Sequence, residues 1–153
     1  MKIYIDQSNK IEQTNKDTIL SLSNSIQYTI LIPARTKRRL KEFFRMHGQS
    51  KSFIFKTFAA GIFLLLKYSN IKNEKIIIDM EYPGRDKQIK FFIEKMDKRT
   101  GTKFNLSFER IGKKSNAHNL AYQVANKKLS TNKIVSLREI EQTLSLKPKS
   151  RGV

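Results

Sequence analysis

Two short isoleucine-rich segments of the chain end in carboxylates. They read Lys2-Ile-Tyr-Ile-Asp6 and Lys75-Ile-Ile-Ile-Asp79-Met-Glu81, in a chain with only 13 Asp and Glu against 31 Lys and Arg. Because side chains alternate between the two faces of a strand, Asp79 and Glu81 project to the same side and could bind one ion together. Carboxylates that lie close together repel unless a cation is held between them. The pattern predicts a metal site made of Asp6, Asp79 and Glu81 at the ends of two strands.

The alternative for each segment is structural, since Asp favours turns and often follows a strand. Because the pattern occurs twice in a chain so poor in acids, the metal site and the structural role are equally well supported. The chain has no cysteine, which excludes disulfides, thiolate nucleophiles and zinc sites that use cysteine. Any metal must therefore be bound by oxygen, with imidazole as the other available ligand, and we expect Mg²⁺ or Mn²⁺.

The formal net charge of +18 in 153 residues indicates a polyanionic partner or a surface that repels itself. Nucleic acid is the commonest such partner, and anionic membrane or an acidic protein is the alternative. The N-terminus lacks the basic and then apolar order of a signal peptide. The longest apolar run, 53–66, is interrupted by Lys56 and is too short to cross a bilayer. We expect a cytoplasmic protein without a membrane partner.

Two basic segments are candidates for contact with phosphates. The first lies at 35–45 in an amphipathic helical pattern, and the second, 112–115, precedes another helix, whose N-terminal amides favour anions. The second segment lacks the Gly-x-x-x-x-Gly-Lys spacing of a nucleotide-binding loop. Exposed basic runs are usually only solvated surface, and that alternative stays open. The predicted nucleic-acid-binding residues are Arg35, Lys37, Arg38, Arg39, Lys41, Lys113, Lys114 and Ser115.

Hydrophobic periodicity predicts an α/β fold with a mixed five-stranded sheet and helices packed on it. The strand-helix-strand order in the C-terminal half implies parallel pairing. Thr36 and Ser115 are the predicted N-caps of two helices. One domain, 1–145, is expected, followed by a disordered basic tail, 146–153. The predicted strands are 2–6, 18–23, 27–33, 75–80 and 104–108, and the predicted helices are 36–46, 51–68, 115–125, 137–144 and one that includes 89–96.

This order of elements resembles the ribonuclease H-like fold, which ribonucleases H, Holliday-junction resolvases, integrases and transposases share. The resemblance covers residues 1–128, with short local motifs. The family's first strand carries an Asp, matched by Asp6, and its fourth strand ends in an acid, matched by Asp79 with Glu81 beside it. The family's last helix begins with an Ala-Asp or Ala-His pair before a Leu-Ala step, and Ala117-His118-Asn119-Leu120-Ala121 has this form.

The resemblance implies that the first and fourth strands lie side by side, which would bring Asp6 to Asp79. It implies a metal-dependent nuclease whose catalytic residues are Asp6, Asp79, Glu81 and His118, with His118 as a ligand or a proton carrier. Three formal negative charges are enough for one hard cation and marginal for two.

The family's Glu in the first long helix has no counterpart in 51–68, where Lys56 stands near its place. Glu81 or Glu12 is the candidate to replace it. The leading hypothesis is a nuclease that hydrolyses phosphodiester bonds in RNA/DNA hybrid or branched DNA. The alternative, which the missing Glu supports, is a non-catalytic nucleic-acid-binding module that retains the fold. Resolvases act as dimers, so a homodimer is an alternative to a monomer, with 51–68 in the core or at the interface.

Overall fold

A mixed six-stranded β-sheet forms the centre of the structure, a computed structural model that describes residues 2–23, 26–72, 74–101, 103–111, 116–127 and 129–146. The predicted α/β class and mixed sheet are confirmed. The strands are β1 (Lys2–Ser8), β2 (Thr18–Ser23), β3 (Tyr28–Ile32), β4 (Lys75–Asp79), β5 (Asn105–Glu109) and β6 (Lys133–Ile134).

The sheet has the order β5-β4-β1-β2-β3-β6. β1, β2 and β3 pair antiparallel in sequence order, whereas β4 pairs in parallel with β1 and β5 pairs in parallel with β4. The predicted count of five strands was wrong, because β6 pairs in parallel with β3 at the far edge. A strand of two residues has no periodicity that a sequence pattern could reveal.

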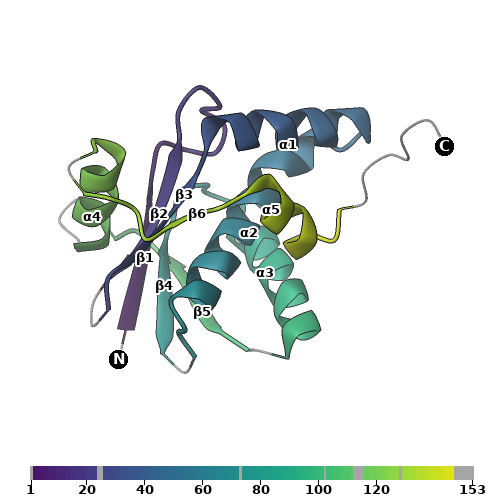
Figure 1. Cartoon of the computed structure of the whole chain (residues 1–153). Coiled ribbons are helices and arrows are strands. Elements are labelled where there is room, and N and C mark those ends of the chain that lie inside the picture. Colours follow the sequence, from purple (N-terminus) through teal and green to yellow (C-terminus); the bar gives the residue numbers. More distant parts are fainter. Residues whose placement is uncertain are drawn as a thin grey trace.

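Five α-helices and one short 3-10 turn lie in the described part of the chain. They are α1 (Ala34–Met46), η1 (Ser50–Ser52), α2 (Phe53–Tyr68), α3 (Asp86–Thr100), α4 (Asn116–Ala125) and α5 (Leu137–Thr143). α4 packs against β1 and β2 on one side of the sheet, and the other α-helices lie on the opposite side (Figure 1). On the side of the sheet that α4 covers, α4 is therefore the helix that can reach the metal site predicted from β1 and β4.

The main core lies between the sheet and α2, which is buried nearly all round. Gly61 of α2 faces the sheet: a Cβ added there would lie 2.6 Å from Cδ1 of Leu20 and 3.1 Å from Cδ1 of Ile32. Glycine therefore allows the helix to approach the strands closely. A smaller cluster holds α4 on the other side and consists of Ile19, Ala121 and Val124.

Lys37 is buried on α1, which corrects its prediction as a nucleic-acid-binding residue. Its exposed fraction is 0%, and its Nζ donates hydrogen bonds to the carbonyl oxygens of Lys10 and Gln13 and to Oγ1 of Thr18. Burial lowers the pKa of Lys37 to about 8. The acceptors lie in or directly after residues 9–17, the β1–β2 loop. Lys37 therefore fastens this loop to α1 and contributes nothing to the outer charged surface.

α1 begins earlier than predicted. Pro33 occupies the N-cap position in place of Thr36, and Oδ1 of Asp17 accepts a hydrogen bond from the backbone N of Ala34 at 2.8 Å. Because Asp17 belongs to the β1–β2 loop, a pattern read along the helix alone could not reveal this acceptor. Ser115, the other predicted N-cap, lies outside the described residues.

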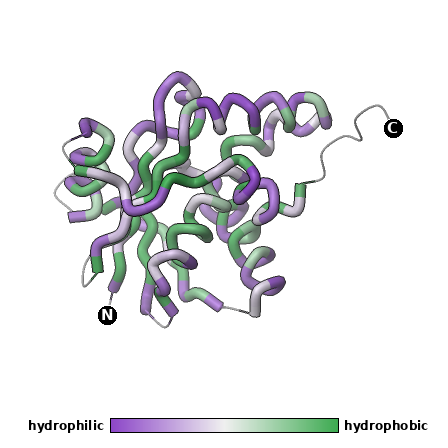
Figure 2. The backbone as a smooth tube through the Cα atoms, viewed as in Figure 1, coloured by the Kyte–Doolittle hydropathy of each residue, from purple (hydrophilic) through white to green (hydrophobic). Residues whose placement is uncertain are grey.

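Hydrophobic residues follow the strands and α2, whereas α1 is largely hydrophilic (Figure 2). Of the predicted tail, 146–153, only Leu146 belongs to the described residues, and it packs against the core. In the part of the chain that the structure describes, none of the helices is long and apolar enough to cross a bilayer.

Candidate metal centre

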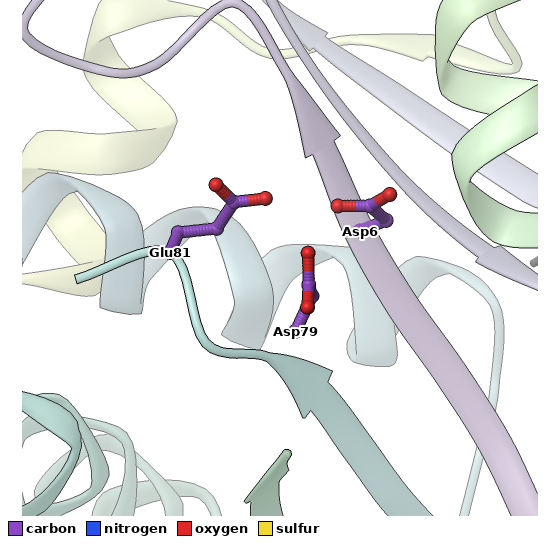
Figure 3. A group of neighbouring side chains, drawn as sticks. All are labelled: Asp6, Asp79 and Glu81. Carbon is purple, nitrogen blue, oxygen red and sulfur yellow. The ribbon is translucent and has the colours of Figure 1, made fainter. Parts of the chain in front are cut away.

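Asp6, Asp79 and Glu81 point toward one another at one end of the sheet (Figure 3). One carboxylate oxygen of each residue lies within 4.8 Å of those of the other two. Asp6 belongs to β1, Asp79 is the last residue of β4, and Glu81 follows in the next loop. The structure thus brings together the three residues predicted as metal ligands, and their oxygens could bind one cation.

The pairing of β1 with β4 places Asp6 beside Asp79. Their parallel register aligns Ile5 with Ile78, so the next residue of each strand is an aspartate. β1 continues in its pairing with β2 as far as Ser8, which corrects the expectation that this strand ends at Asp6. The pairing of β1 with β4 ends at Ile5, so Asp6 lies at the point where the β4 edge of β1 becomes unpaired.

Glu81 is positioned by the turn after β4 and by Tyr82. The backbone N of Glu81 donates to the carbonyl oxygen of Asp79 at 2.9 Å. Tyr82 is buried and packs edge-on against Phe58 of α2, with ring centroids 5.1 Å apart. The Tyr82 hydroxyl donates to Oε1 of Glu12 at 3.1 Å, and Glu12 is not part of the carboxylate cluster. Of the two acids proposed to replace the missing helix Glu, the structure brings Glu81 to the site.

Burial raises the pKa of Glu81 to about 8, and a hydrogen bond with Asp6 and the charges of Asp6 and Asp79 act in the same direction. Burial also raises the pKa of Asp6, whose exposed fraction is 3%. Both shifts favour a proton within this hydrogen-bonded pair of acids when no metal is bound. A divalent cation would replace this proton, since it compensates carboxylates that otherwise repel.

Hydrogen-bond partners orient both aspartates. The backbone N of Gln7 donates to Oδ1 of Asp6 at 2.8 Å, and Nδ1 of His118 lies 2.9 Å from Oδ2 of Asp6. The backbone N of Ile111 donates to Oδ1 of Asp79 at 2.9 Å. Partners of this kind hold ligating carboxylates in a fixed orientation. His118 reaches Asp6 from the first turn of α4.

A cavity of about 580 Å³ opens over the carboxylates. Lys10 and Arg110, two cations that the sequence analysis did not identify, line it. Nζ of Lys10 lies 3.5 Å from the carbonyl oxygen of Glu81 and 5.7 Å from the centre of the Tyr82 ring. Arg110 directly follows β5, the neighbour of β4. A cation at the end of a predicted strand next to the strand of Asp79 could have been identified from the sequence. The charged or titratable residues that line the cavity are Asp6, Lys10, Asp79, Glu81, Arg110 and His118.

One exposed cation of α1, Arg38, contacts the loop that borders the metal cavity. Nη1 of Arg38 donates to the carbonyl oxygen of Thr14 at 2.8 Å, and the same β1–β2 loop contributes to the cavity wall. The basic surface of α1 consists of Arg35, Arg38, Arg39 and Lys41. The other predicted phosphate contacts, Lys113, Lys114 and Ser115, lie outside the described residues.

The raised pKa of Glu81 predicts that metal stabilises the protein more at high pH. Without metal, the folded protein binds more protons at this group than the unfolded chain between pH 4.5 and 8. The unfolding free energy contributed by Glu81 therefore falls as pH rises through this interval. Added Mg²⁺ or Mn²⁺ should raise the melting temperature by several degrees, and by more above pH 8 than below it.

Thermal unfolding with metal and with EDTA, on both sides of pH 8, measures this effect. Glu81→Gln cannot titrate and is the control, which should lose most of the metal effect and its dependence on pH. A metal effect of the same size at every pH in the wild type would contradict the exchange of a proton for a cation.

No family model, no curated protein and no solved structure matches this chain. Support for a function therefore comes from the carboxylates, the groups that contact them and the charge of the molecule. Oxygen ligands flanked by cations can bind a divalent ion together with an anionic substrate.

Proposed function

We propose that the protein is a divalent-metal-dependent nuclease of the ribonuclease H-like fold, which hydrolyses phosphodiester bonds in structured nucleic acid. The observation that carries the proposal is the convergence of Asp6, Asp79 and Glu81 within 4.8 Å in a chain of net charge +18. Three carboxylates at one point repel one another, and a bound cation removes this cost. RNA/DNA hybrid and branched DNA are the proposed substrates.

The order of the strands supports the ribonuclease H-like assignment. That fold places its first and fourth strands side by side, and β1 pairs with β4 here, between an antiparallel β2 and a parallel β5. α4 brings His118 within 2.9 Å of Asp6, which agrees with the function of the last helix in that family. The additional edge strand β6 is a departure from the expected sheet.

The residues of the cavity suit hydrolysis of a phosphodiester. Asp6, Asp79 and Glu81 would hold one Mg²⁺ or Mn²⁺, and the all-oxygen set fits such a hard cation. Such an ion would supply a more acidic water for in-line attack on phosphorus and positive charge to stabilise the leaving 3′ oxygen. His118 orients Asp6 and is placed to carry a proton.

Cations of the cavity and of α1 would bind the phosphates of the substrate. Lys10 and Arg110 line the cavity itself, where they would neutralise charge on the reacting phosphate. The basic surface of α1 would bind phosphates further along the strand. Lys113, Lys114 and Ser115 stay proposed contacts on the basis of sequence. Phosphate contacts position a nucleic acid without reading its sequence, so we expect selectivity for structure.

Cleavage of labelled nucleic acids tests the proposal. Single-stranded, duplex, hybrid and four-way-junction substrates are incubated with Mg²⁺, Mn²⁺ or EDTA. Products that require metal and form faster from a structured substrate than from the single strand support the nuclease. Substrates that the protein binds but leaves intact with every metal would reject it.

A non-catalytic nucleic-acid-binding module is the second candidate function. α2 contains no acid, whereas the ribonuclease H-like resemblance includes a Glu in this helix. The module requires no cation, so a calorimetric titration with Mn²⁺ separates the two candidates. Saturable binding that Asp6→Asn removes supports the nuclease, and the absence of binding supports the module.

Removal of cations from the basic surface of α1 should weaken binding to all nucleic-acid sequences alike. Arg35→Ala combined with Arg39→Ala should reduce the slope of log affinity against log salt by about one for each phosphate that the protein no longer neutralises. The control is Lys95→Ala combined with Lys98→Ala, which removes the same charge from exposed positions of α3. Fluorescence anisotropy at several salt concentrations measures both slopes. Equal slopes for the two double variants would exclude α1 from the interface.

A further inference from the structure

A second cavity, which the proposed function leaves unused, shares lining residues with the metal cavity. The second cavity has a volume of about 520 Å³ and lies between the β1–β2 loop and the C-terminal half of α4. Ser8 and Asn9 line both cavities, so the two meet at the end of β1. On α4, His118 lines the metal cavity, and Tyr122, about one helical turn later, lines the second.

The second cavity combines buried apolar residues with a polar rim. Ile19 and Val124 belong to the cluster that packs α4 on the sheet, and they line the cavity from within. Tyr122 is the aromatic residue of the wall, with an exposed fraction of 55%. The amides and charged residues of the rim are Asn9, Asn15, Asn126, Lys16, Lys127 and the acid Asp17.

Two of the rim amides are fixed by hydrogen bonds to the backbone. Nδ2 of Asn9 donates to the carbonyl oxygen of Asp17 at 3.1 Å, and Nδ2 of Asn126 donates to that of Tyr122 at 2.9 Å. Each amide has a second N–H on Nδ2 and an acceptor in Oδ1, so it can form a further hydrogen bond with a ligand. A nucleobase has N–H donors along its edge and a flat face that stacks on aromatic rings. Its chemistry therefore matches the residues of this cavity.

We propose that the second cavity binds one unpaired nucleotide of the substrate strand, next to the phosphate held at the metal centre. Tyr122 stacks on the base, and Lys16 and Lys127 bind the flanking phosphates. A base inside a duplex is stacked and paired, so it must leave the helix to enter a cavity. The inference rests on the proposed function for the position of the reacting phosphate. It narrows the substrate to nucleic acid with an unpaired nucleotide beside the cleaved bond.

Binding of a short single-stranded DNA, compared with an abasic strand of the same length, tests this proposal. The two strands carry the same phosphates and differ only in their bases. Fluorescence anisotropy in EDTA measures both affinities without cleavage. The wild type should bind the strand with bases roughly tenfold more tightly, as expected when one base stacks on an aromatic side chain.

Tyr122→Ala should abolish the difference between the two strands without changing the affinity for the abasic strand, and Tyr122→Phe should retain it. The matched control is Phe91→Ala, which removes an aromatic residue of α3 with an exposed fraction of 60%. It should leave the difference between the strands unchanged. Thermal unfolding of each variant, followed by circular dichroism, verifies that the fold is intact.

Equal affinity of the wild type for the two strands would overturn the proposal. A loss of base-dependent binding in Phe91→Ala as large as that in Tyr122→Ala would also overturn it. Because the assay contains no metal, its result is independent of the nuclease activity. A protein that binds bases through Tyr122 but cleaves nothing would contradict the proposed function and support the nucleotide cavity. Cleavage without base-dependent binding would do the reverse.

Discussion

Asp79→Asn is expected to lower the rate of metal-dependent cleavage by about a thousandfold while the protein stays folded. The substitution removes one of the three carboxylates that lie within 4.8 Å of one another. Asparagine keeps an Oδ1 that can accept the hydrogen bond that the backbone N of Ile111 now donates to Asp79 at 2.9 Å. Binding of nucleic acid should persist or tighten, because the cavity loses a negative charge.

Cleavage rates with Mg²⁺ or Mn²⁺, together with thermal unfolding curves, measure the effect of Asp79→Asn. The control is Glu109→Gln, since Glu109 is exposed, lies opposite Asp79 in the β4–β5 pairing and does not line the metal cavity. It removes the same charge from the neighbouring strand and should leave the rate unchanged. Wild-type cleavage by a folded Asp79→Asn protein would exclude the carboxylate cluster as the catalytic site. An unfolded variant would instead assign Asp79 to the support of the fold.

Lys37→Met should lower the free energy of unfolding by about 2 to 4 kcal/mol. Methionine keeps the apolar length of the side chain but lacks the ammonium group, which donates hydrogen bonds at 2.7 to 3.3 Å. The acceptor oxygens of Lys10, Gln13 and Thr18 would then lose this donor in a buried position. Because Lys10 and Gln13 also line the metal cavity, the variant should bind Mn²⁺ more weakly.

Urea denaturation measures the loss of stability in Lys37→Met. The matched control is Arg38→Met, because Arg38 is exposed and also donates to the β1–β2 loop, at 2.8 Å from the carbonyl oxygen of Thr14. An exposed group of this kind should contribute less than about 1 kcal/mol. Equal losses in the two variants would show that the burial of Lys37 has no special effect on stability.

The pH dependence of stability provides a second measurement for Lys37. Burial lowers its pKa from the ordinary value of 10.5 to about 8, so between these values the unfolded chain binds more protons than the folded protein. The unfolding free energy contributed by Lys37 should therefore rise with pH over this interval, by at most about 1.4 kcal/mol per pH unit. Lys37→Met should lack this rise. Parallel pH curves for the two proteins would contradict the lowered pKa.

The sequence predicted the elements whose burial can be read from the apolar pattern of adjacent residues. The apolar run Ile76 to Ile78 belongs to the predicted strand 75–80, and these residues are buried in β4. β6 could not be predicted in this way, because its position depends on distant contacts. Asn132 accepts a hydrogen bond from the backbone N of Thr29 at 2.8 Å, and Thr131 also contacts Thr29.

The carboxylate cluster was predictable because its geometry follows from strand pairing. Asp6 and Asp79 follow apolar runs that pair in parallel, and parallel strands present the same ends at one edge of a sheet. Glu81 joins them through the turn after β4, because the strand ends at Asp79 and its alternation does not extend to residue 81. The raised pKa of Glu81 could not be predicted, since it depends on how far the surrounding residues bury the group.

The burial of Lys37 was missed although its spacing contained a signal. Leu40 and Phe44 follow three and seven residues later, and all three side chains lie on the buried face of α1. Lys37 was assigned to the outer face because of its charge. The acceptors that offset the cost of its burial come from the β1–β2 loop, which the helix pattern does not include. A charged residue at the spacing of an apolar stripe indicates such acceptors elsewhere in the chain.

The alignment of Ile5 with Ile78 limits how the chain can vary in evolution. Ile3 and Ile5 are fully buried, and other apolar side chains of similar volume would replace them at modest cost. An insertion or deletion of one residue before Asp6 would instead turn its side chain to the opposite face of the sheet. The carboxylate would then point away from Asp79 and from α4. Related sequences can therefore differ in the residues of β1, but the number of residues before the aspartate should stay the same.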